Sequence, residues 1–96
     1  QIAYIKTSEI DSRDKDIILN DGTNIVLKNL NFKNLLEMLP SKDFAQVNKK
    51  EIIALSSIKV FSTNEIITTI TLDDVGFLRL QVGEIYRKKL SDLFGK

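Results

Sequence analysis

The 96-residue chain contains no cysteine, no histidine and no tryptophan. Without cysteine it can form neither a disulfide nor a thiolate metal site, and without histidine it lacks the usual zinc ligand and the usual general base. These absences exclude most familiar hydrolytic active sites. We therefore expect neither an enzyme nor a bound cofactor.

Long apolar runs are also missing from the sequence. No stretch is long enough to span a bilayer, and no basic segment followed by an apolar one marks a signal peptide. We expect a cytoplasmic protein with no membrane partner. The first residue is Gln1 rather than methionine, so we expect the chain to be cut from a longer protein or to follow removed residues.

An excess of one charge is the third feature that the chain lacks, because 14 basic residues stand against 13 acidic ones, a net charge of +1. A strongly basic balance would by itself indicate a nucleic-acid partner. Here the places of the basic residues matter more than their number. The length and the 43% hydrophobic content fit one domain, 1–96, with a modest core.

The stretch Asn29–Phe61 supplies the clearest helix. Its apolar residues recur at i, i+3, i+4 and i+7, at Phe32, Leu35, Leu36 and Leu39. Asn31 can cap the first turn, and Pro40 ends the element, so the spacing predicts a helix over Phe32–Leu39. A helix of about two turns is not stable alone. It must therefore lie on a sheet.

Runs rich in isoleucine, valine, phenylalanine and threonine before and after this helix predict β-strands. The expected strands are Gln1–Ser8, Lys15–Asn20, Thr23–Lys28, Phe44–Val47, Glu51–Leu55, Ser57–Phe61, Glu65–Leu72 and Phe77–Val82. Alternation makes the first strand half-buried, and Asp21-Gly22 predicts a two-residue type I′ turn between the second and third. A loop at Asp73–Gly76 joins the last two. After Gly83, a candidate N-cap, the apolar period becomes helical from Glu84 onward.

The polar segment Glu9–Asp14 has too few apolar residues to be buried, so we expect an exposed loop that could carry function. Asp11, Asp14 and Asp16 lie near one another in the sequence, as in a calcium loop. The glycine and the closing glutamate that such a loop requires are missing. We therefore expect no metal site.

These elements make a mainly β domain of small antiparallel sheets and hairpins, with a short helix after the third strand and a C-terminal helix. Their order, together with DFAQVNKKEIIALSSIKVF and LRLQVGEIYRKKL, resembles the LytTR DNA-binding domain of bacterial response regulators. The apolar frame of that family fits at Phe44, Val47, Ile52, Ile53, Leu55, Ile58, Leu80, Val82, Tyr86 and Leu90. The resemblance implies an elongated set of small sheets whose loops enter successive major grooves of double-stranded DNA. It further implies an attached receiver or sensor domain and two copies on one DNA site.

Arg87 matches the closing pattern of the family, but most other polar positions of the family pattern differ in this chain. Gln46 stands in the place of an arginine, Asn48 of a histidine and Glu51 of an aromatic residue, and the closing serine-arginine pair is Gly83-Glu84. The resemblance puts a base-reading arginine where Glu84 stands. A carboxylate can accept from cytosine N4, but phosphates repel it.

The candidate DNA-contact residues are Arg13, Lys15, Asn48, Lys49, Lys50, Arg87 and Lys88. Lysines in a turn or on a helix are often simply solvated, and Asn48 can instead bond its own turn backbone. Two hypotheses follow. The chain is the DNA-binding output domain of a two-component transcriptional regulator, or a LytTR-like fold that has lost base readout and serves as a protein-interaction or dimerisation module. Gathering of the basic side chains on one face would favour the first.

Overall fold

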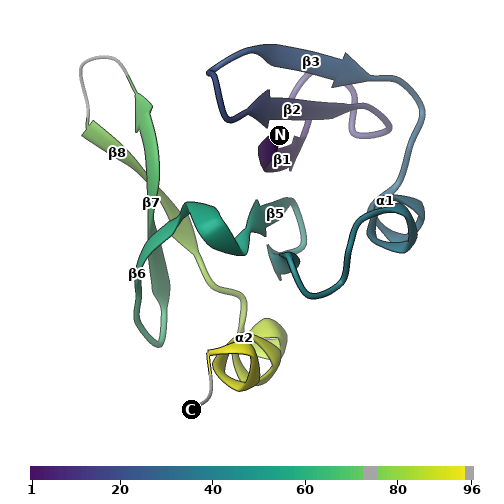
Figure 1. Cartoon of the computed structure of the whole chain (residues 1–96). Coiled ribbons are helices and arrows are strands. Elements are labelled where there is room, and N and C mark those ends of the chain that lie inside the picture. The colour runs from purple at the N-terminus through teal and green to yellow at the C-terminus, as the bar shows by residue number, and fades with distance from the viewer. Residues whose placement is uncertain (73–75, 95–96) are drawn as a thin grey trace.

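The computed structural model describes residues 1–72 and 76–94 as two antiparallel sheets with two short α-helices (Figure 1). The predicted mainly β class, with one helix after the third strand and one at the C-terminus, is confirmed. The described chain measures 36 × 32 × 22 Å, a flattened body rather than a markedly elongated one.

The larger sheet has five strands in the order β3-β2-β1-β5-β4. Its strands are β1 (Ile2–Thr7), β2 (Lys15–Leu19), β3 (Asn24–Leu27), β4 (Phe44–Asn48) and β5 (Glu51–Ala54). The central strand β1 pairs antiparallel with β2 on one side and with β5 on the other, so that Tyr4 lies opposite both Ile18 and Ile53. Strands that lie far apart in the sequence, such as β1 and β5, are therefore neighbours in the sheet.

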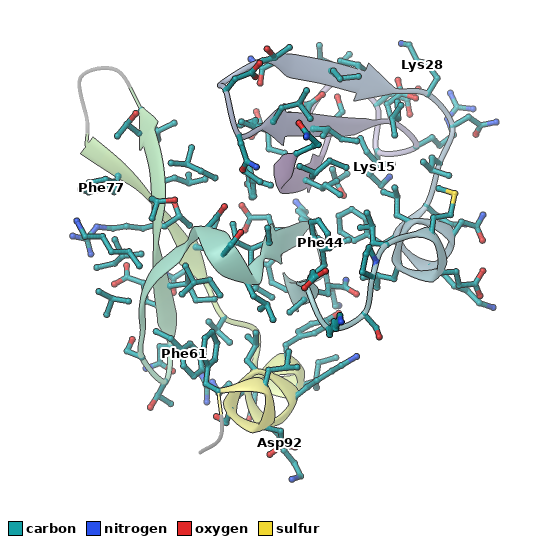
Figure 2. The ribbon with its side chains drawn as sticks, in the orientation of Figure 1. Lys15, Lys28, Phe44, Phe61, Phe77 and Asp92 are labelled. Carbon is teal, nitrogen blue, oxygen red and sulfur yellow. The ribbon has the colours of Figure 1, made fainter. Side chains whose placement is uncertain are left out.

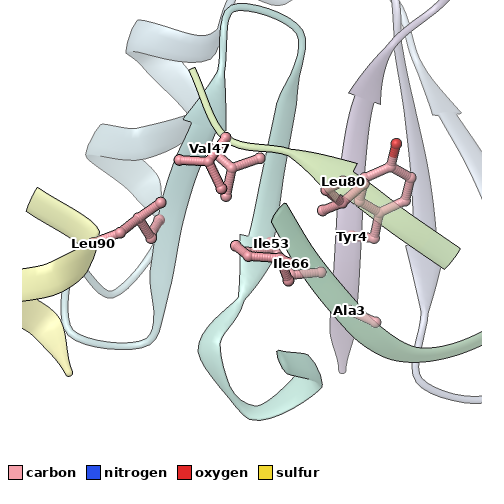
Figure 3. Packing of buried hydrophobic residues seen from close by; sticks show 9 residues of the cluster. Ala3, Tyr4, Val47, Ile53, Ile66, Leu80 and Leu90 are labelled. Carbon is pink, nitrogen blue, oxygen red and sulfur yellow. The ribbon is translucent and has the colours of Figure 1, made fainter. Parts of the chain in front are cut away.

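The prediction that the first strand is half-buried was wrong at its centre, because Ala3, Tyr4 and Ile5 are all buried. Both faces of the sheet are covered. Tyr4 belongs to a cluster that includes Ile53, Ile66, Leu80 and Leu90 (Figure 3). Ile5 belongs to a second cluster on the opposite face, with Ile17, Leu35 and Ile52.

The first helix, α1 (Phe32–Met38), covers the second cluster, as its apolar spacing predicts. The Asn31 side chain accepts a hydrogen bond from the Asn34 backbone N–H at 2.8 Å and so caps the helix. Leu39 is extended, at φ −93° and ψ 146°, as expected for the residue before a proline. Leu35 is the buried residue of the helix.

The β2–β3 hairpin lies where Asp21-Gly22 predicts it, but the turn type was wrong. Gly22 has φ +89°, whereas Asp21 does not have the positive φ that a type I′ turn requires. The Gly22 N–H donates to the Leu19 carbonyl at 2.9 Å, and the Asp21 side chain accepts from the Thr23 N–H at 2.9 Å. This is a three-residue loop with a left-handed glycine at its end.

The smaller sheet has the order β6-β7-β8, with β6 (Ile58–Phe61), β7 (Glu65–Leu72) and β8 (Gly76–Gln81). A short 3-10 turn, η1 (Leu55–Ser57), links β5 to β6 and was not predicted. The loop expected at 73–76 falls on 73–75, which lie outside the described residues, and on Gly76, which begins β8. Figure 1 shows this sheet beside the larger one, with α2 below both.

The C-terminal helix begins later than its sequence period indicates. Glu84–Tyr86 form a 3-10 turn, η2, and α2 covers Arg87–Leu93. Leu90 is the buried residue of α2, and Phe94 stacks on Phe61 with ring centroids 5.1 Å apart. The helix is thereby fixed against both sheets.

Candidate nucleic-acid interface

Three connections meet at the end of the larger sheet where β1 finishes and β5 starts. They are the β1–β2 loop, the β4–β5 turn and the segment from Gln81 to Tyr86 after β8, and they line a groove of about 1050 Å³. Residues far apart in the sequence, such as Ser8 and Glu84, share this groove. Each of the loops that the sequence singles out for DNA contact contributes to it.

Asn48 fixes the β4–β5 turn from inside. Its side-chain amide donates to Glu51 Oε1 at 2.7 Å and to the Gln81 carbonyl at 2.8 Å, and its oxygen accepts from the Lys50 backbone N–H at 2.8 Å. The alternative that Asn48 bonds its own turn is confirmed. Because both amide hydrogens are used within the protein, Asn48 holds the turn and β8 together rather than presenting its side chain to a partner.

Glu51 extends this network into the sheet. The Tyr4 hydroxyl donates to Glu51 Oε2, while Asn48 donates to the other carboxylate oxygen. Burial, together with the adjacent Glu51 carboxylate, raises the pKa of Tyr4 far above its usual range, so the phenol stays a neutral donor. Glu51 therefore acts as a structural acceptor at a position where the family pattern has an aromatic residue.

The segment that follows β8 is held on both sides. The Val82 N–H donates to the Asn64 carbonyl at 2.9 Å, and the Gly83 N–H donates to the Val47 carbonyl at 2.8 Å. A Cβ atom on Gly83 would lie 2.9 Å from the Tyr86 ring, so only glycine fits this close approach without a shift. Glu84, the next residue, is exposed on the groove.

The turn lysines Lys49 and Lys50 are exposed and line the groove, and Lys6 at the end of β1 joins them. Lys6 was missed because only cross-strand pairing, which sets it opposite Glu51, brings it to this edge. Two exposed carboxylates, Glu9 and Glu84, share the same groove. The groove therefore carries both signs of charge at its surface.

Arg87 and Lys88 begin α2 directly after Tyr86, whose side chain lines the groove. The Lys88 side chain is 89% exposed and lies 3.5 Å from Asp92. Arg87 is half-buried, and its Nε atom is enclosed without a hydrogen-bond partner among the residues that the structure describes. Both residues lie beside the groove rather than in its lining.

Two of the sequence candidates lie away from the groove. Lys15 is only 5% exposed, and its Nζ donates a hydrogen bond to the Ser12 carbonyl at 2.8 Å. The same Nζ atom lies 5.4 Å from the centre of the Phe32 ring, on the side of the sheet that faces α1 (Figure 2). Contact between Lys15 and DNA is therefore not supported. Arg13 is exposed but paired with Asp11 at 2.8 Å, an interaction that lowers the pKa of Asp11 to about 2.

No metal-binding geometry is found in residues 1–72 and 76–94, where no three acidic side chains come together. Asp14, one of the three aspartates near the start of the chain, accepts from the Asn29 N–H at 3.0 Å and pairs with Lys28 at 3.2 Å. In the same part of the chain, neither helix has the length and apolar character needed to cross a membrane.

A sequence profile of the LytTr DNA-binding domain matches residues 1–95. The chain belongs to the LytTR family. Its fold is also similar to a solved LytTr DNA-binding domain from Bacillus cereus, described as part of a putative methyl-accepting/DNA response regulator, with a TM-score of 0.74 over 99% of this chain and 82% of that one. At 15% sequence identity this likeness concerns the fold alone. No curated protein sequence matches this LytTR domain.

Proposed function

We propose that this LytTR domain binds double-stranded DNA as the output domain of a bacterial transcriptional regulator of the two-component response type. The observation that carries the proposal is that Lys49 and Lys50 share one groove with the Gly83-Glu84 turn, where the family pattern has its base-reading arginine. Exposed ammonium groups suit phosphates, and loops beside them can reach base edges. The role is recognition rather than catalysis and needs no cofactor.

The dimensions of the domain suit this mode of binding. Its longest extent of 36 Å is close to one turn of B-DNA, about 34 Å, so one domain can cover about one turn on one side of the duplex. We further propose that two copies bind adjacent turns and that a receiver or sensor domain in the full-length protein controls them. Such a regulator would act in the bacterial cytoplasm.

The proposal is tested through the salt dependence of binding. Fluorescence anisotropy of the chain on a random-sequence duplex should give an affinity that falls steeply with salt, because phosphate contacts release counterions. Changing Lys49→Ala and Lys50→Ala together should flatten the log–log slope by up to about 2 units, since each phosphate contact contributes about 0.9.

A matched control is Lys33→Ala with Lys42→Ala, two lysines that do not line the groove. This pair should leave the slope unchanged. If the groove pair and the control pair alter the slope equally, the β4–β5 turn is not part of the binding surface. If the wild-type chain binds no duplex at low salt, the proposed function itself is wrong.

The second candidate is a protein-interaction or dimerisation module. It is favoured by the carboxylates of Glu9 and Glu84 on the groove, and by the internal use of Asn48 and Glu51, which removes polar side chains from base readout. This candidate predicts that DNA does not bind and that a protein partner occupies the same groove.

A further inference from the structure

Two isoleucines are the most exposed large hydrophobic residues in residues 1–72 and 76–94. Ile10 in the β1–β2 loop is 98% exposed and Ile85 in η2 is 79% exposed. Of the two, only Ile85 lines the groove. Single exposed apolar residues are ordinary on protein surfaces. Ile85 is distinguished from them by the way its backbone is held and by the groups that surround it.

The backbone around Ile85 is fixed on both sides while its side chain takes no part in the core. The Gly83 N–H donates to the Val47 carbonyl at 2.8 Å, and the Tyr86 N–H donates to the Gly83 carbonyl at 2.9 Å. Val82 before the turn and Leu90 after it are buried. Ile85 belongs to neither buried cluster. The turn therefore presents an aliphatic side chain at a constant position on the groove.

The charges around Ile85 give little discrimination by themselves. Lys6, Lys49 and Lys50 line the groove, but so do the exposed carboxylates of Glu9 and Glu84. Lysines that bind phosphates fix the register on DNA and carry no sequence information. Discrimination between bases at this surface therefore has to come from a contact that does not depend on charge. Ile85 is the exposed aliphatic side chain on the groove that can make such a contact.

We propose that Ile85 reads a thymine by packing against its C5-methyl group in the major groove. That methyl is the apolar group that base edges display there, and neither cytosine nor uracil carries it. The inference rests on the proposed DNA-binding function and names a base preference that Glu84 cannot supply. Its carboxylate accepts only from exocyclic amino groups, such as cytosine N4, and thymine displays no donor in the major groove. The Ile85 contact therefore requires a thymine in the DNA site at the position beside the Gly83-Glu84 turn.

The test uses duplexes selected by the wild-type chain from a random library. Each thymine of a selected site is replaced singly by uracil, which removes only the methyl group, and affinities are measured by fluorescence anisotropy for wild type and Ile85→Ala. At one thymine, uracil should weaken wild-type binding about three- to fivefold, the factor for one methyl returned to water. Ile85→Ala should bind the parent site more weakly and show no further loss with uracil there.

Ile25→Ala is the matched control, because Ile25 is an exposed isoleucine of β3 that does not line the groove. It should keep the full uracil effect. The inference is overturned if no thymine is sensitive to uracil in the wild type, if the selected site has no thymine, or if the sensitivity persists in Ile85→Ala. Salt-dependent binding with any of these results leaves the proposed function standing. Absence of all duplex binding, with a protein partner captured on the groove instead, overturns both.

Discussion

Glu84 is the residue at which this chain differs most from the pattern of its family. Its side chain is exposed on the groove, next to a glycine whose backbone is hydrogen bonded to β4. In the proposed docking, phosphates surround this turn, and a negative charge without a cytosine donor is unfavourable there. In this docking, Glu84 lowers the affinity for most DNA sequences and restricts binding to sites that offer a cytosine amino group to its carboxylate.

Replacing this carboxylate should strengthen binding. Glu84→Arg removes a repulsive charge and adds a bidentate donor for guanine, so affinity should rise by about 1–3 kcal/mol on a duplex selected by the variant. On random duplex the gain should be smaller, since it comes from charge alone. Fluorescence anisotropy at matched salt compares wild type and variant on both duplexes.

The control for this substitution is Glu37→Arg, which makes the same charge change on α1, outside the groove. It should raise affinity only slightly and without sequence preference. Equal gains for Glu37→Arg and Glu84→Arg on every duplex would contradict docking at the Gly83-Glu84 turn and would favour the interaction module.

Residue roles could be predicted from the sequence where they depend on neighbours in the chain. The exposure of Lys49 and Lys50 follows from a polar turn between two strands. The burial of Lys15 does not, because it depends on Phe32 and on the Ser12 carbonyl, which folding brings to it. Asn48 likewise binds Gln81, 33 positions away. Contacts of this kind have no local signal.

At the scale of elements, the local sequence predicted where helices and turns lie better than it predicted the turn type or the burial of a strand. α1 begins after its asparagine cap and stops before Pro40, as expected. The β2–β3 hairpin lies at Asp21-Gly22, but its turn has three residues because the Asp21 side chain accepts from Thr23 and only Gly22 takes a positive φ. The alternating pattern of β1 predicted one buried face, but both faces are buried. The second face is covered by elements that come later in the chain, which the local pattern cannot indicate.

The helix α1 should be purely structural, because its one buried side chain, Leu35, fills the cluster beneath the larger sheet. Leu35→Ala should lower the free energy of unfolding by about 2–5 kcal/mol, and chemical denaturation measures it. Met38→Ala, on the same helix but 66% exposed, is the control and should change it by less than about 0.5 kcal/mol. A loss for Leu35→Ala as small as that of Met38→Ala would contradict this assignment.

At the scale of the whole molecule, one sheet separates two cores. α1 covers one face, and the smaller sheet with α2 covers the other. Strands β1, β4, β5 and β8 all contribute buried residues to these cores, and the loops that follow or join them line one groove. The family resemblance predicted this general architecture, whereas the convergence of Lys6 with the turn lysines required the strand pairing itself.

The central claim, that DNA docks on this groove, is tested most directly by nuclear magnetic resonance on the isotopically labelled chain titrated with a selected duplex. Backbone amides of the β1–β2 loop, of Lys49 and Lys50, and of Glu84 to Tyr86 should show the largest shift changes, while amides of α1 should change little. Shift changes concentrated on α1, or none at all, would contradict docking on this groove.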